Sequence, residues 1–225
     1  DKFKAEVYDR AEKSLKFLDA CMDPVSQELP NYGSNDGALF FKLTDDDYRN
    51  YQSQLNDLRA VIFGFVNEKS ESQQWYGLKD IKTENTIKQG IYSFRDSGYQ
   101  IIQELDVKTF IRCGSYKDRP CQADNLHLDI WAKGINYFWD PGSFLYNTDA
   151  KTLNYFIGTA AHNTVSINGE NQMLKGDRFI WYNWIKVTQS NITEEEDKFI
   201  FKGSIIGFKH IGERKHTRII TKYKD

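Results

Sequence analysis

Hydrophobic residues recur with a helical period at the start of the chain. Over residues 1–22 apolar side chains return every three or four positions, with Lys and Glu between them, and Pro24 stops the pattern. A second helix is predicted from Asp45 to Phe63, with Thr44 as its N-cap and Gly64 as its stop. Its expected buried stripe consists of Tyr48, Tyr51, Leu55, Leu58 and Ile62.

The pattern changes to alternation in the second part of the chain. Residues 67–89 are polar and weakly patterned, which predicts a linker, and from Gly90 onward short alternating runs predict the strands of a sandwich. The runs are Gly90–Arg95, Gln100–Leu105, Thr109–Cys113, Asp124–Trp131, Phe179–Val187 and Lys198–Gly207. We therefore predict an α+β fold, with a helical segment over 1–66 and a mostly antiparallel β-sandwich over 90–225 that is cut short at its C-terminal end.

The run from Asp124 to Trp131 has an unusual polar face. As a strand it places Leu126, Leu128 and Ile130 on one side and Asn125, His127, Asp129 and Trp131 on the other. Asp129 could orient His127 and raise the pKa of its imidazole. The alternative is a His–Asp pair that bridges loops on the sandwich surface.

Two further polar groups follow this strand. Asp140 lies in the turn sequence Trp139-Asp140-Pro141-Gly142, and His162 with Asn163 precedes another alternating run that ends in the hairpin signal Asn168-Gly169. Either His162 is a buried histidine hydrogen-bonded to a turn, or it contacts a metal or a substrate.

Composition limits the possible partners. The 225 residues are 40% hydrophobic and 28% charged with a net charge of −2, which gives no overall attraction to nucleic acid or to an anionic membrane. A binding site for an acidic ligand must therefore carry local positive charge. The aromatic content of 15% suits sugar stacking and an all-β core equally well. No apolar run is long enough to span a membrane.

Other common sites find no support in the sequence. The three cysteines, Cys21, Cys113 and Cys121, form no CxxC pair, although a single Cys113–Cys121 bridge stays open. There is no Gly-rich phosphate loop, GxSxG elbow or HExxH helix, which argues against nucleotide-binding, serine-hydrolase and zincin functions.

Several motifs, in order, resemble the heparinase II/III-like polysaccharide lyases. ADNLHLDIW (123–131), DPGSFLYN (140–147) and NYFIGTAAHNTVSING (154–169) are similar to the sandwich of that family, and RFIWYNW (178–184) and HTRII (216–220) to its later strands. PNYGSNDGALFFKL (30–43) is similar to the end of its helical (α/α) toroid. The resemblance covers roughly residues 30–220.

This resemblance implies β-elimination of acidic, uronate-containing polysaccharides. It also implies that the chain is a fragment, because the catalytic Asn and Tyr of the family belong to toroid helices upstream. The missing remainder of its own chain is then a partner, and the fragment alone is expected to be inactive. A lyase of this kind is expected in the periplasm or secreted from a bacterium.

The resemblance also suggests site residues. Asn31, Tyr32, Asn35 and Asp36 would line the cleft between toroid and sandwich, although the same residues could simply cap neighbouring backbone. Arg112 and Arg119 could grip a uronate carboxylate, because guanidinium binds carboxylate in a bidentate fork, or could only solvate the surface. Asn163 is a further candidate for substrate binding, and His127 and His162 are the candidate catalytic residues.

A metal, usually zinc, is also implied by the family. By motif its ligands map onto Gln122, Asp140 and His162. Gln122 stands where the commoner pattern has His, and Gln is a poorer zinc ligand than imidazole. Pro120 stands where some members have a further catalytic His. These departures favour a second function, a non-catalytic glycan-binding or surface-polysaccharide assembly protein with a degenerate lyase site.

Overall fold

The computed structural model describes residues 3–34, 42–84, 89–145 and 147–224. Its N-terminal part is helical: α1 (Ala5–Cys21) packs on α2 (Gln52–Phe63) through Leu15, Met22 and Leu55. A short helix, α3 (Ser72–Trp75), and a parallel pair, β1 (Phe65–Val66) with β2 (Lys82–Thr83), follow. The expected linker therefore contains regular structure, and the domain boundaries at 66 and 90 stay a prediction.

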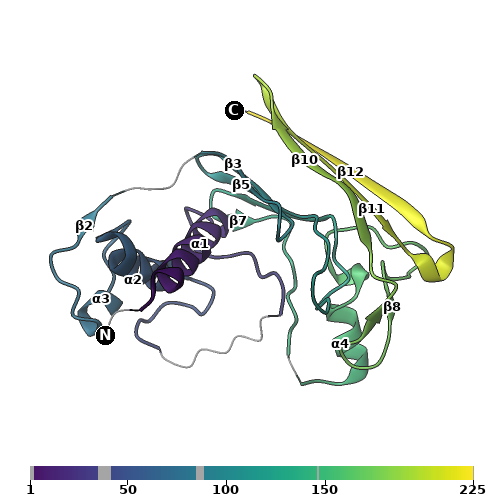
Figure 1. Ribbon diagram of the computed structural model, residues 1–225, viewed down its shortest axis with the longest axis horizontal. Helices are drawn as coiled ribbons and strands as arrows, with labels where there is room; N and C mark the ends of the chain where they lie inside the picture. Colours follow the sequence, from purple (N-terminus) through teal and green to yellow (C-terminus); the bar gives the residue numbers. More distant parts are fainter. Residues whose placement is uncertain (1–2, 35–41, 85–88, 146, 225) are drawn as a thin grey trace.

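Two antiparallel sheets form the rest of the molecule (Figure 1). The first contains five strands in chain order: β3 (Gly90–Phe94), β4 (Tyr99–Gln103), β5 (Val107–Arg112), β6 (His127–Ala132) and β7 (Ile135–Asn136). The second contains β10 (Lys186–Glu194), β11 (Lys198–Gly207) and β12 (Arg214–Tyr223). The helices α4 (Ala150–Phe156), η1 (Thr159–Ala161) and η2 (Lys209–Ile211) and the pair β8 (Leu174–Lys175) and β9 (Trp181–Tyr182) complete it.

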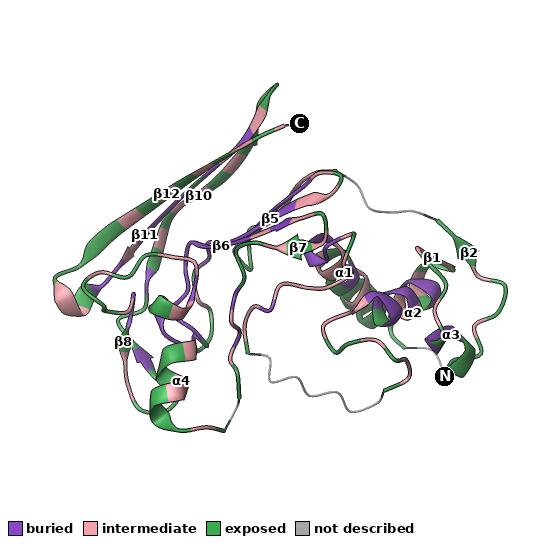
Figure 2. Ribbon diagram, turned by 180° about the vertical axis from the view of Figure 1, so that it is seen from behind, coloured by how far each residue is buried: buried purple, intermediate pink, exposed green. Residues whose placement is uncertain are grey.

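The five-stranded sheet is covered on both faces. One face packs on the second sheet, where Ile111 and Leu126 join Phe201 and Ile205 in the main core. The other face is covered by the end of α1 and the segment that follows it, through the cluster of Ala20, Cys21, Ile101 and Phe110, with Phe17, Leu29 and Tyr32 against it. Figure 2 shows the resulting burial along β5 and β6. Among the described helices, none combines the length and the apolar character needed to cross a bilayer.

The predicted α+β class is confirmed, and several elements fall where the pattern placed them. The helix over residues 1–22 appears as α1, Gly64 ends α2 in the left-handed conformation (φ 77°), and the run Lys198–Gly207 forms β11. Asn168 and Gly169 both have positive φ between the bridged residues Ile167 and Glu170, which makes the predicted tight turn.

The predicted start of the second helix was wrong. The helix begins at Gln52 instead of Asp45, because the preceding residues pair with residues 27–29: Leu29 N–H donates to Arg49 O, and Tyr51 N–H donates to Gln27 O. Thr44, the predicted N-cap, donates its hydroxyl to the Asp46 carboxylate, which also accepts the hydroxyl of Ser53.

Two strand predictions need correction, and the disulfide that the sequence left open is absent between the two described cysteines. β6 begins only at His127, since Leu126 has φ 61°. The run 179–187 is divided between β9 and the start of β10. Cys113 is buried and Cys121 is exposed, and both are free thiols.

Candidate functional site

The polar face of β6 is the buried one. His127, Asp129 and Trp131 are almost fully buried, whereas Leu128 and Ile130 on the opposite face are only partly so. The register places Arg112 opposite His127 and Lys108 opposite Trp131, so this face carries several ionisable groups under the helical segment. A surface His–Asp pair is therefore excluded.

Asp129 is also not the partner of His127. The Asp129 carboxylate accepts a hydrogen bond from Asn136 Nδ2 at 3.3 Å, while His127 Nδ1 lies 3.4 Å from Asp140 Oδ2. The expected upward shift was wrong: burial lowers the pKa of His127 to about 4, against the opposing attraction of Asp140. The imidazole of His127 is thus neutral at pH 7.

His127, Asp140 and His162 form a buried cluster. His162 Nδ1 lies 2.9 Å from the same Asp140 Oδ2, and one donor atom from each residue lies within 4.8 Å of the other two. The two imidazole rings are nearly perpendicular, with centroids 6.0 Å apart. Burial alone would lower the pKa of His162, but the hydrogen bond and the charge of Asp140 outweigh it and raise that pKa.

The turn after β7 fixes the position of the Asp140 carboxylate. Gly142 N–H donates to Asp140 Oδ1 at 2.7 Å, and Gly142 has φ 72°. A Cβ at this glycine would lie 2.7 Å from Asn31 Nδ2, so the turn also needs glycine for space. The predicted Asn31 therefore packs against the turn that carries Asp140.

The donor set of this cluster fits a divalent cation. His127 Nδ1 faces the Asp140 carboxylate, and its single lone pair accepts the Asn163 N–H at 3.2 Å, a hydrogen bond that it would exchange for a metal if this nitrogen were the ligand atom. Two electron-rich atoms in that arrangement are stabilised by a cation between or beside them. His127 Nε2, His162 Nε2 and Gln122 Oε1 are buried, and none has a hydrogen-bond partner among the described residues.

Gln122 lies beside the cluster. Its side chain is buried, and its Nε2 donates to Gly142 O at 3.4 Å, in the same turn as Asp140. Of the three residues that the motif assigned to a metal, Asp140 and His162 are in contact and Gln122 adjoins them. His127 was not predicted from the sequence as a metal ligand. Two features of the sequence together could have indicated it: Gln122 stands where the family pattern has histidine, and a histidine occurs five residues later, in the predicted strand.

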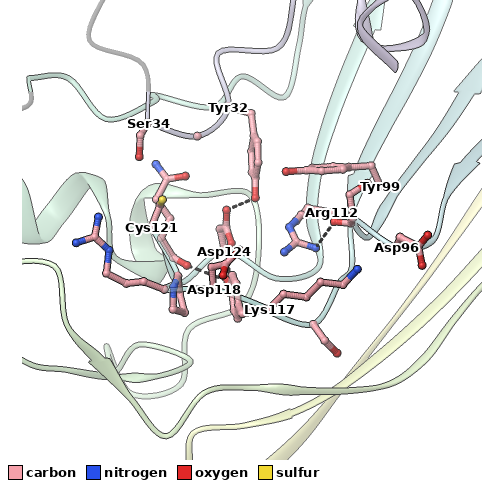
Figure 3. Close-up of a pocket in the computed structure, with 16 residues that line it drawn as sticks. Tyr32, Ser34, Asp96, Tyr99, Arg112, Lys117, Asp118, Cys121 and Asp124 are labelled. Atoms are coloured by element: carbon pink, nitrogen blue, oxygen red, sulfur yellow. Dashed lines mark hydrogen bonds between the residues drawn. The ribbon is translucent and has the colours of Figure 1, made fainter. Parts of the chain in front are cut away.

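A cleft of about 460 Å³ lies next to the cluster, under the loop that carries Tyr32 (Figure 3). The Tyr32 hydroxyl points into it and hydrogen-bonds to Asp124, whose other oxygen accepts from the Tyr116 hydroxyl at 3.0 Å. Burial first, and then the charge of Asp124, raises the pKa of both tyrosines, which keeps the phenols protonated. They are therefore hydrogen-bond donors at neutral pH.

Three cations line the same cleft. The Arg112 guanidinium lies 5.2 Å from the ring centroid of Tyr99 and 5.4 Å from that of Tyr116, and its Nη1 donates to Ser97 O. Lys117 and Arg119 are exposed along the cleft. The Arg119 guanidinium carbon lies 4.9 Å from the ring centroid of Phe179, which supports that side chain. Among the described residues three carboxylates, Asp96, Asp118 and Asp124, also line the cleft, so its cations are matched in number and the predicted local excess of positive charge is not found there.

The remaining predicted site residues do not all lie in the cleft. Asn163 uses its side-chain amide to bond the carbonyls of Phe138 and Trp139, which is a structural contact. His127 and His162 are not among the residues that line the cleft. Asn35 and Asp36 lie outside the described residues. Tyr32 connects the two parts, because its ring lies 5.6 Å from that of His127 while its hydroxyl faces the cleft.

Comparison with known proteins places this sandwich in a family. The family model described as "Heparinase II/III-like, C-terminal" matches residues 86–225, more than half of the chain, and the chain belongs to this family. A curated heparin-sulfate lyase from Bacteroides stercoris is 25% identical over 179 residues, which cover 76% of this chain and 24% of that protein.

Solved structures share the fold. Heparinase III, the BT4657 gene product, matches with a TM-score of 0.66 at 18% identity and covers 97% of this chain and 31% of its own. Heparan sulfate lyase HepC from Pedobacter heparinus matches with a TM-score of 0.64 at 15% identity, again over 97% of this chain and 31% of its own. The chain thus spans about a quarter of the length of the curated relative and about a third of that of these structures.

Proposed function

We propose that the chain is part of a polysaccharide lyase that cleaves uronate-containing glycans by β-elimination. The observation that carries this proposal is the cleft of protonated tyrosines and cations beside a buried His–Asp–His cluster, in a chain of the heparinase II/III-like family. The similarity to a curated heparin-sulfate lyase supports an acidic glycosaminoglycan as the substrate class.

Eliminative cleavage requires neutralisation of the uronate carboxylate, a base and an acid, and the cleft residues suit the first of these. A base removes the C5 proton, the C4–O bond breaks as the C4=C5 double bond forms, and an acid protonates the leaving oxygen. Arg119 and Lys117 would neutralise the uronate carboxylate, which makes the C5 proton more acidic. Tyr32, whose phenol already donates its single hydrogen to Asp124, would accept a hydrogen bond from a sugar hydroxyl. We propose that the base comes from a helical toroid in the remainder of the protein.

For the metal we propose zinc or another divalent ion held by His127, Asp140 and His162, with Gln122 Oε1 as a neighbouring oxygen donor. These three ligands are buried, which is typical of closed structural sites, whereas catalytic sites leave a position open to substrate. When bound, the ion would supply a cross-link between the turn at Asp140 and the segments around His127 and His162. Both histidines then act as ligands, and neither acts as the base.

The second candidate is a non-catalytic glycan-binding or polysaccharide assembly protein. Pro120 and Gln122 favour it, since both stand where family members can have histidine and both line the cleft. His127 could replace the ligand that is missing at Gln122, but it does not replace the histidine that some family members have at the position of Pro120.

The decisive experiment uses the full-length protein and a panel of uronate polysaccharides, followed by ultraviolet absorbance. Elimination leaves an unsaturated uronate that absorbs, whereas hydrolysis and binding do not. We expect the absorbance to rise with wild type and with the control His210→Ala, which removes a histidine outside the cluster, and to stay flat with His162→Ala. A flat trace for folded wild-type protein on every glycan would favour the second candidate.

Arg119→Gln should weaken glycan capture. The variant removes an exposed cation from the cleft, so KM of the full-length enzyme is expected to rise about tenfold, equivalent to ~1.4 kcal/mol, with a smaller change in kcat. The matched control is Arg178→Gln, an exposed arginine outside the lining of the cleft. Equal KM values for the two variants would remove Arg119 from the proposed binding site.

A further inference from the structure

Arg218 on β12 reaches across to the other sheet. Its Nη1 donates to two backbone carbonyls, Leu126 O at 2.7 Å and Asn163 O at 2.6 Å. These acceptors belong to separate segments of the chain, 92 and 55 residues away from the arginine. A partly buried guanidinium that joins two distant loops constrains their relative position, because both bonds share one nitrogen.

Both carbonyls adjoin residues of the His–Asp–His cluster. Leu126 immediately precedes His127, and Asn163 immediately follows His162. The same peptide segment closes the arrangement from the other side, since Asn163 N–H donates to His127 Nδ1 at 3.2 Å. Arg218 therefore connects the two backbone segments that carry His127 and His162, the two histidines whose imidazoles face Asp140.

The backbone at Leu126 needs such support. Leu126 has φ 61°, a left-handed conformation that is uncommon and strained for a leucine. The chain enters β6 directly after this residue, at His127. Leu126 N–H donates to Arg112 O at 2.7 Å, and Arg218 bonds its carbonyl, so both polar groups of this peptide segment are fixed.

A glycine on the second sheet leaves space for the Leu126 side chain. Gly203 on β11 is the register partner of Arg218 on β12. A Cβ at Gly203 would lie 2.6 Å from Leu126 Cδ2, so a side chain there would push Leu126 away. The missing side chain lets Leu126 enter the core, where its exposed fraction is 0%.

We propose that Arg218 is a positioning residue for the metal site: it fixes the peptides beside His127 and His162 so that their imidazoles meet at Asp140. This inference rests on the metal site of the proposed function and adds a residue from a strand that contributes no ligand. The guanidinium acts through the backbone and touches neither the metal nor the substrate.

The test compares Arg218→Met, Arg218→Lys and Arg214→Met in the full-length protein. Arg214 is an exposed arginine on the same strand that bonds only the nearby carbonyls of Gly212 and Glu213, which makes it the matched control. The readouts are the Kd for zinc, from competition with a chromophoric chelator, and the melting temperature of the metal-free protein.

Arg218→Met is expected to weaken zinc binding about 10- to 100-fold, the range typical of groups that orient metal ligands. Arg218→Lys should recover part of that loss, because the ammonium is also a multiple donor on a shorter side chain, and Arg214→Met should bind like wild type. A lower melting temperature of Arg218→Met with an unchanged zinc Kd would overturn the proposal. If Arg218→Met does not fold, Arg218→Lys decides, and a wild-type Kd in that variant would overturn it.

A failure of the proposed metal site can be distinguished from a failure of the positioning role of Arg218. If wild-type protein does not bind zinc, that part of the proposed function fails, and Arg218 is judged on the imidazole NMR signals of His127 and His162 in metal-free protein. These signals should move in Arg218→Met and not in Arg214→Met. Identical signals in both variants would contradict the positioning role.

Discussion

Asp140→Asn in the full-length protein is expected to weaken zinc binding about 100-fold or more, a larger effect than loss of an orienting group. Both imidazoles face the same carboxylate oxygen, at 2.9 Å for His162 and 3.4 Å for His127. Asparagine keeps the size of the side chain but removes the negative charge that the cation requires. Lyase activity should fall with metal content, because the turn at Asp140 lies beside the cleft.

The control for this substitution is Asp149→Asn. Asp149 is the N-cap of α4, where its Oδ1 accepts from Thr152 N–H at 3.0 Å, and asparagine serves equally well at that position. The measurement is metal content by atomic spectroscopy together with the zinc Kd. If Asp140→Asn retained the wild-type Kd, the His–Asp–His cluster would be only a hydrogen-bonded core and the metal proposal would fail.

Lys108→Met is expected to stabilise the protein at neutral pH by a few kcal/mol, roughly the range seen when buried charges give way to apolar side chains. Lys108 is fully buried on the helix-covered face of β5, and its amine has no hydrogen-bond partner among the described residues. Burial lowers its pKa from 10.5 to about 7, although Cys21, Asp23 and Asp129 oppose the shift. Methionine has a similar length and no charge to desolvate.

The same lysine predicts a pH dependence. The unfolded chain holds the Lys108 proton up to its ordinary pKa of 10.5, whereas the folded protein holds it only below about 7. Between these values the unfolded state binds more protons, so the free energy of unfolding rises with pH. Wild type should therefore gain stability from pH 7 to pH 9.5 in chemical denaturation, and Lys108→Met should gain less.

Lys202→Met, on the exposed side of β11, is the control for both statements. It should leave the free energy of unfolding at pH 7 and its rise with pH as in wild type. A Lys108→Met protein that is less stable than wild type at both pH values would show that the amine has a favourable partner when folded.

The sequence predicted the elements with strong local signals. α1 and β11 formed where the apolar period is clear, because burial of a continuous stripe or face fixes each element almost independently of its surroundings. The second helix started late because residues 49–51 pair with residues 27–29, and no local pattern contains that contact. The bend at Leu126 was missed for a similar reason, since leucine gives no signal for positive φ.

The residue types of the site also came from the sequence. Asp140 and His162 were singled out together, and the structure brings them into contact. Tyr32 was expected in a cleft and Arg119 was a candidate to bind a uronate carboxylate, and both line the same cleft. What the motif could not supply was the third member of the cluster: His127 was paired with Asp129, its neighbour on the strand, instead of with Asp140.

The sequence by itself determined the α+β class, the family and a polar face on β6. Only the tertiary structure decided that this face is covered by α1 and the Tyr32 segment, which turns a strand of mixed polarity into a buried group of ionisable side chains. The physical reason is that alternation tells which side chains share a face, whereas burial depends on which distant segment packs against that face. The roles of His127, Lys108 and Arg218 all depend on that packing.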